Sequence, residues 1–375
     1  MISIAIISIL FFVIEGKYDW NIHKLKTFFI LSSLFFIALI TLFYSNNLDF
    51  GIKSIQRLLP VVVFPLVFLF NKKTLLNKHK IDVIKFVYIG SILLFLVFLQ
   101  IYFSRIPNLS FLEKRDVFEE ITKVHGTYFS IWIGFGVILL AFIFEELLQK
   151  KNKIAFLIPI ISIYFVYWQY TIGARMPFFA TVLFLILFAF YKTKSWIVFI
   201  SFIVGLSLVL ALNKDGLSER VNNLTKYNFS FPKGQYSTNY MNISTEQVRN
   251  GIYYCSYNKI KEAPFFGYGI GDADDQLQEC YDENFTDTDT YKILNYNSHN
   301  QYINIILVSG FVGFSIFVFS IICLLKKGMK NKLYLSFLCF ILLNFCFENI
   351  LSRHDGIIFF SFFNSLLYFQ TNNDS

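Results

Sequence analysis

Charge is scarce in this sequence. Only 15% of its 375 residues are Asp, Glu, Lys or Arg, whereas soluble domains carry about a quarter. Since 55% of the residues are hydrophobic, the deficit argues against an ordinary soluble domain and predicts a membrane protein. Histidine and cysteine number only five each and do not cluster at metal-ligand spacing, which argues against a metal site.

The net charge of +8 is explained by membrane topology. Lysine clusters occur in every second loop between apolar segments, as the positive-inside rule requires. The clusters fall within 17–26, 72–80, 150–153, 192–194 and 326–332. Placing them in the cytoplasm leaves 44–57, 104–125, 171–175, 213–298 and 351–355 on the outer face. We therefore expect a lipid bilayer as the partner and no nucleic acid.

Apolar segments predict an all-α polytopic integral membrane protein with about 11–12 transmembrane helices. The segments lie near 1–15, 27–43, 58–70, 83–103, 126–147, 154–170, 176–191, 196–212, 300–324, 333–350 and 356–370. This gives about eight helices in 1–212, an external loop domain in 213–298 and about three helices in 299–375. Because 58–70 contains Pro60 and Pro65, we expect that segment to be kinked.

The external loop 213–298 has recognisable parts. Ile252, Cys255 and Ile260 are spaced as in an amphipathic helix lying on the membrane, and Pro264 ends that helix. Cys255 and Cys280 either form a disulfide, as an oxidising outer compartment favours, or remain free thiols. The acids of 272–289 do not follow the spacing of an EF-hand. We interpret them as a solvated acidic surface.

His299 stands where this loop re-enters the membrane. Two interpretations stay open from its position: a structural hydrogen bond to a neighbouring loop, or a general base, since imidazole exchanges protons near neutral pH. Gly310 and Gly313 follow in the same apolar segment and are expected to permit close helix packing.

Arginines are few on the outer face. Arg175 lies in a turn of about five residues between two apolar segments, where it either snorkels to the headgroups or grips phosphate with its planar fork. Arg249 opens the predicted amphipathic helix. For His125, Arg57 and Glu348, we expect ion pairs that hold helices together rather than catalytic roles.

Taken in order, these residues resemble the O-antigen ligase and polymerase family of bacterial envelope glycosyltransferases. The ligase signature is His, then Asn, Ser or Gln, nine residues, and Gly-x-x-Gly. His299-Asn300, residues 301–309 and Gly310-Phe-Val-Gly313 reproduce it without a gap. Arg175 falls between two mid-chain helices, as in the family. Arg249 precedes Pro264-Phe-Phe-Gly-Tyr-Gly269, which matches a second family pattern.

The resemblance implies a metal-independent glycosyltransferase without cofactors. Its donor would be a glycan on undecaprenyl diphosphate, and its acceptor a sugar hydroxyl of lipid A-core or of another glycan. His299 would be the base of an inverting single displacement, and Arg175 and Arg249 would hold the diphosphate. Asn300, Gly310 and Gly313 would have supporting roles. The protein would lie in the bacterial inner membrane with its active site on the periplasmic face.

Several alternatives remain open. Within the same chemistry, the chain is either a ligase, a polymerase that extends O-antigen or exopolysaccharide repeats, or a protein O-glycosyltransferase. Phe314, where ligases often carry Thr or Val, slightly weakens the ligase interpretation against the polymerase, but the ligase remains the main interpretation. A transporter of lipid-linked glycans usually shows two similar halves. No internal repeat is visible in this sequence.

Overall fold

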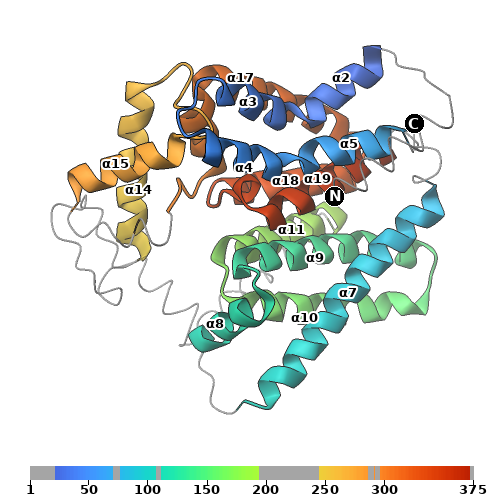
Figure 1. Cartoon of the computed structure of the whole chain (residues 1–375). Coiled ribbons are helices and arrows are strands. Elements are labelled where there is room, and N and C mark those ends of the chain that lie inside the picture. Colours follow the sequence, from blue (N-terminus) through green and yellow to red (C-terminus); the bar gives the residue numbers. More distant parts are fainter. Residues whose placement is uncertain are drawn as a thin grey trace. The chain divides into compact units, whose positions relative to one another are not determined.

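The computed structural model describes residues 22–70, 77–106, 111–193, 245–285, 291 and 296–371, and this part of the chain is helical without any strand (Figure 1). Within it, six helices are long and apolar enough to cross a membrane, or seven if the bent pair α2 (Ile22–Leu31) and α3 (Ser33–Leu42) forms one span. The predicted all-α polytopic membrane fold is therefore confirmed.

The described ranges contain fewer long spans than the 11–12 predicted helices. The predicted segments 1–15 and 196–212 lie outside them. Two others are helical but short: α18 (Lys332–Phe345) has 14 residues and α19 (His354–Gln370) has 17. Leu59 separates α4 (Leu48–Leu58) from α5 (Pro60–Phe70). Pro60 thus takes the first position of α5, where its missing N–H breaks no hydrogen bond.

The chain divides into two compact units. The first draws on 1–76, 227–331 and 345–375, and the second on 77–226 and 332–344. The division of the sequence into 1–212, 213–298 and 299–375 stays a prediction.

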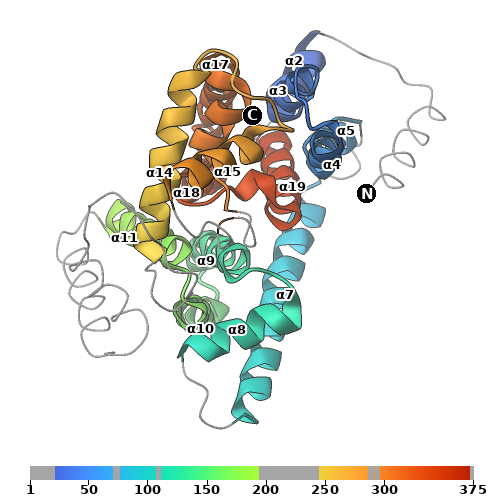
Figure 2. The same ribbon diagram turned by 60° about the vertical axis from the view of Figure 1, so that its left-hand side comes forward.

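The second unit is built around one central helix, α9 (Gly126–Gln149). Its other elements are α7 (Lys78–Ser104), α8 (Phe111–Thr122), η1 (Lys153–Phe156), α10 (Leu157–Ile172), α11 (Arg175–Thr193) and most of α18. Helices α10 and α11 flank α9 in both views (Figures 1 and 2). The fully buried Gln169 of α10 donates to the carbonyl of Ser130 at 2.7 Å and to Thr181 Oγ1 at 3.0 Å. This polar link fixes the three helices, because a buried amide without partners is costly.

The first unit contains the candidate site. Besides α2–α5 and α19, it comprises α14 (Thr245–Glu262), α15 (Ala273–Asn284), α17 (Gln301–Gly328) and η2 (Ile350–Ser352). Helix α17 packs against α3, α19 packs against α5, and α14 crosses α15 (Figure 1).

Helices α14 and α15 share a small hydrophobic core. Cys255 and Cys280 are joined in a disulfide with their Cα atoms 5.6 Å apart. The core also contains Ile252, Leu277 and, from the start of α17, Leu307. Both Ile252 and Cys255 are fully buried there. The amphipathic helix is thus present, but the expectation that its apolar face lies on the membrane is wrong, because that face packs against protein.

Candidate active site

Asn300 starts helix α17 and fixes its position. Its side-chain oxygen accepts hydrogen bonds from the N–H groups of Tyr302 and Ile303 at 3.0 and 3.1 Å, which caps the helix. Its side-chain nitrogen donates to the carbonyl of Cys346 at 2.9 Å. One side chain therefore caps α17 and ties it to Cys346 in the turn that precedes α19.

Residues on both sides of Asn300 are held by the turn between α18 and α19. The buried Asn349 donates to Ser298 Oγ at 3.1 Å, and Gln301 Oε1 accepts the N–H of Leu351 at 2.7 Å. Residues 298–301 and this turn thus form one hydrogen-bonded unit, so the backbone that carries His299 is fixed on both sides.

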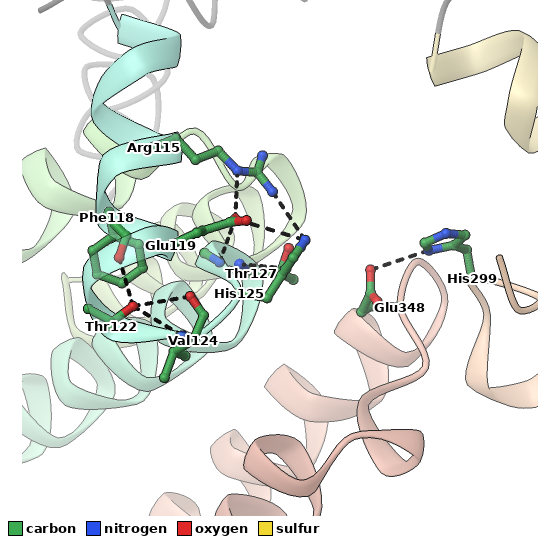
Figure 3. A network of polar contacts seen from close by, with 10 residues as sticks. Arg115, Phe118, Glu119, Thr122, Val124, His125, Thr127, His299 and Glu348 are labelled. Carbon is green, nitrogen blue, oxygen red and sulfur yellow. Dashed lines mark hydrogen bonds and ion pairs between the residues drawn. The ribbon is translucent and has the colours of Figure 1, made fainter. Parts of the chain in front are cut away.

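His299 faces the carboxylate of Glu348. Its Nδ1 lies 3.6 Å from Glu348 Oε2, and the two side chains are 22% and 13% exposed (Figure 3). The histidine has φ = 44°, a left-handed conformation that costs energy in a residue with a Cβ. Its N–H donates to Asn297 Oδ1 at 3.1 Å, which supports this backbone. The sequence did not indicate this pairing, because Glu348 is distant in the chain and was expected only to hold helices together.

Helix α17 is interrupted at Gly310, where φ is 60° and ψ is −170°. The loop 264–269 pairs with the backbone groups that this break leaves open. The N–H groups of Phe311 and Val312 donate to the carbonyls of residues 264 and 265 at 2.8 and 3.2 Å. In return, the N–H groups of residues 268 and 269 donate to the carbonyls of Leu307 and Val308 at 2.8 and 2.9 Å. The Gly310-Phe-Val-Gly313 motif and the 264–269 motif of the sequence are therefore hydrogen-bonded to each other.

This junction requires glycine at Gly310 and Gly267. A Cβ at Gly310 would overlap the backbone of Phe265, and one at Gly267 would lie 2.7 Å from the carbonyl carbon of Val308. Both residues also have positive φ. The expectation of helix packing is therefore wrong for Gly310, which instead admits a loop. A Cβ at Gly313 would lie 3.1 Å from Ile37 of α3, so at that position helices do pack closely.

Asp272 joins the same loop to the first helices of the unit. Its carboxylate accepts the N–H groups of Asn46 and Asn47, both at 2.7 Å, and the residue is 8% exposed. The N–H of Ile270 donates to Thr41 Oγ1 at 3.2 Å. The acidic stretch is therefore not simply a solvated surface, since Asp272 is buried and hydrogen-bonded.

The first unit also contains two predicted arginines, Arg249 and Arg57. Arg249 lies partly buried on α14, and within the described ranges its guanidinium makes no hydrogen bond or ion pair. The guanidinium of Arg57 lies 5.5 Å from the centre of the Phe50 ring. The ion pair expected for Arg57 does not occur among the residues that the structure describes.

Arg175 and His125 belong to the second unit. Arg175 is the first residue of α11 and follows Gly173, the left-handed cap of α10. The residue therefore lies at a helix N-terminus, where anions are favoured.

His125 caps α9, because its Nδ1 accepts the N–H of Thr127 at 3.3 Å. Its Nε2 lies 3.4 Å from Arg115 Nη2 and 3.9 Å from Glu119 (Figure 3). Glu119 also accepts hydrogen bonds from the N–H of Gly126 and from Arg115 Nε, at 2.9 and 3.0 Å. This network holds α8 against the start of α9. Over the described residues, no group of three or more His, Cys, Asp or Glu side chains is arranged to hold a metal ion.

Comparison with known families matches one stretch of the chain. Residues 154–318 match the family model described as O-antigen ligase. The match runs from η1 into α17, so it includes His299, Arg175, Arg249, Gly310 and Gly313. No curated protein matches the chain in sequence. The resemblance to the O-antigen ligase family is confirmed over these residues.

Proposed function

We propose that the chain, in which residues 154–318 match the O-antigen ligase family model, is a ligase which transfers a glycan from undecaprenyl diphosphate to a sugar hydroxyl of lipid A-core. The family match and the helical membrane fold support a membrane enzyme of the glycosyltransferase-like O-antigen ligase type. The donor, the acceptor and the chemistry below are the proposal.

The observation that carries the proposal is the pairing of His299 with Glu348. The carboxylate lies nearest Nδ1, so it favours a proton on that nitrogen and leaves Nε2 to accept one from substrate. It also stabilises the imidazolium that forms. At 3.6 Å the two groups form a close charge contact and not a hydrogen bond.

The reaction is a single displacement. The acceptor hydroxyl oxygen attacks the anomeric carbon, its proton passes to His299, and the glycosidic bond to the diphosphate breaks. The diphosphate leaves with the electron pair and needs no proton, so one base suffices and the anomeric centre inverts. Arg175 and Arg249 hold the diphosphate and stabilise its developing charge, for which the guanidinium fork suits two phosphate oxygens.

We place the site on the periplasmic face of a bacterial inner membrane. The Cys255–Cys280 disulfide of α14 and α15 supports this placement, because disulfides persist in the periplasm and are rare in the cytosol. The predicted positive-inside topology places 213–298 on the same side.

The test is a gene deletion with complementation, read as envelope glycans on a gel. A ligase predicts that the deletion strain accumulates lipid-linked polymer beside uncapped lipid A-core, and that wild type restores capping but His299→Ala does not. Immunoblots of the membrane fraction control for insertion and level. Restoration by His299→Ala would remove the histidine from the mechanism. Single repeats on the core in the deletion strain would instead identify a polymerase.

A further inference from the structure

A pocket within the first unit is lined in part by the first turns of α17. It lies between α3, α4, α15, α17 and the η2–α19 turn and has a cavity volume of about 80 Å³. The wall formed by α3 and α17 is apolar and includes Leu34, Ile37 and Ile305. Polar side chains gather on the remaining walls: Ser54, Arg57, Asp274, Gln301, Asn304 and Ser352.

Two charged side chains of this pocket have their hydrogen-bonding groups unused. Within the described ranges, neither the carboxylate of Asp274 nor the guanidinium of Arg57 makes a hydrogen bond or a close ion pair, and both residues are partly buried. Polar groups that line a pocket and are not used by protein are available to a ligand.

The walls that carry these groups are rigid. Asp274 lies in the first turn of α15, which the disulfide and the Asp272 carboxylate fix on either side. Gln301 is held through Oε1 by the N–H of Leu351, which leaves its amide N–H groups for the pocket. A preorganised set of this kind loses little entropy on binding.

The chemistry of the walls favours hydroxyl groups over phosphate. A carboxylate beside the guanidinium opposes a diphosphate by repulsion, whereas sugar hydroxyls donate to carboxylates and accept from Arg, Gln and Asn. The Phe50 ring supplies an apolar face near Arg57. Gln301 also belongs to the 298–301 segment that carries His299, so a ligand here lies against the same hydrogen-bonded unit as the base.

We propose that this pocket is the subsite for the sugar that accepts the glycan, in which Asp274 and Arg57 hydrogen-bond the hydroxyls of a core-oligosaccharide ring. This assignment rests on the proposed function, because it names the acceptor of that reaction. The diphosphate of the donor then belongs with Arg175 and Arg249 and not with this pocket.

The ionisation of Asp274 agrees with a binding role. Burial first, and then the neighbouring Asp275, raise its pKa to about 6, although Arg57 opposes both. Because the folded-state pKa lies above the unfolded value of about 4, this carboxyl's contribution to stability is complete below about pH 4 and is lost as the pH rises through about 6. A side chain that costs stability at neutral pH is a common feature of functional sites.

The test measures binding and not turnover. The purified full chain in lipid nanodiscs is titrated with core oligosaccharide, released by mild acid from lipopolysaccharide of the deletion strain, and followed by saturation-transfer NMR. Inorganic diphosphate is the second probe. The variants are Asp274→Asn and Arg57→Lys, and the matched control is Glu283→Gln, an exposed carboxylate on the same helix.

We expect Asp274→Asn and Arg57→Lys each to weaken oligosaccharide binding about tenfold or more, the cost of losing a charged hydrogen bond. Glu283→Gln should bind like wild type, and diphosphate should bind all four proteins equally. Asp274→Asn should also raise the melting temperature at pH 7.5 and leave it unchanged at pH 4, which shows that the variant is folded.

Several results would overturn the subsite. One is oligosaccharide affinity in Asp274→Asn equal to that of wild type, and another is the lack of saturable oligosaccharide binding by wild type. A third is that diphosphate displaces the oligosaccharide and binds Arg57→Lys more weakly than wild type. The last result would assign the pocket to the donor. Because His299 is unchanged throughout, failure here leaves the base untouched. Conversely, an active His299→Ala with intact sugar binding would remove the base and keep the subsite.

Discussion

The chain contains two histidine–carboxylate pairs, each at the start of a long apolar helix, and they are built differently. His125 lies before α9 in the second unit and His299 lies before α17 in the first. The ring of His125 caps its helix through Nδ1 and touches Arg115 and Glu119 through Nε2. The ring of His299 caps nothing, because Asn300 performs that task.

The difference shows what frees a histidine for chemistry. Both ring nitrogens of His125 are engaged by protein, so it acts as a structural side chain. Nδ1 of His299 faces one carboxylate at 3.6 Å and its ring lies 5.6 Å from that of Tyr296, so Nε2 remains for substrate. Both histidines lie at the start of a helix. They differ in that His125 is itself the capping residue of α9, whereas α17 is capped by Asn300 and not by His299.

The largest difference between the two pairs should appear when the imidazole of His299 or of His125 is removed. His299→Ala should lower glycan transfer by at least about 100-fold, the usual contribution of a general base. His125→Asn retains a side-chain oxygen for the cap and should stay within about twofold of wild type. Transfer is measured in vesicles with lipid-linked glycan and core acceptor extracted from the deletion strain. Equal losses in the two variants would show that the histidines are equivalent.

Neutralising the carboxylate of each pair should affect turnover for the His299 pair and stability for the His125 pair. Glu348→Gln keeps the shape but loses the charge that orients and stabilises His299, so we expect turnover to fall by about 10- to 100-fold with little change in melting temperature. Unchanged turnover in Glu348→Gln would show that the pairing has no catalytic role.

Glu119 should instead affect stability. Burial alone would raise its pKa, but the Gly126 N–H, His125 and Arg115 lower it below the ordinary value. A lowered folded-state pKa means stability that is present at neutral pH and is lost as the pH falls through that pKa. Glu119→Gln should therefore cost about 1 kcal/mol at pH 7, and melting curves of variant and wild type should converge below about pH 4. A pH-independent difference would contradict this account.

The smallest effects should come from the caps themselves. Asn300→Ala and His125→Ala each remove a cap and should cost about 1 kcal/mol in unfolding free energy. Asn300→Ala also loses the hydrogen bond to the carbonyl of Cys346, so of these two variants only Asn300→Ala should lower transfer, by severalfold. Asn300→Asp keeps the side-chain oxygen that caps α17 and should therefore retain the unfolding free energy of the cap. Chemical denaturation and the transfer assay on the same preparations check both effects. If His125→Ala lowers transfer as much as Asn300→Ala, the second pair is not purely structural.

Much of the fold could be predicted from the sequence, because apolar length and lysine placement follow directly from bilayer thickness and topology. The helix at 245–262 also followed from residue spacing. Its burial did not, because Ile252 and Cys255 fit a lipid surface and a protein core equally well. The spacing between Cys255 and Cys280 likewise left two outcomes open.

The site was less accessible to sequence reasoning. His299 and Asn300 carry a local signature and could be singled out. Glu348 could not, since its pairing with His299 depends on the turn after α18. Asp274 was hidden among the other acids of 272–289, where only the fold separates a pocket residue from an exposed one. Long-range packing, which no local pattern encodes, made these differences.

The most direct test of the central claim is chemical rescue of the base. Turnover of His299→Ala and His125→Ala is measured in vesicles with increasing imidazole, alongside wild type. If His299 takes the acceptor's proton, imidazole should raise the turnover of His299→Ala by about tenfold or more and leave the other two proteins unchanged. Wild-type turnover of His299→Ala without imidazole would contradict the claim.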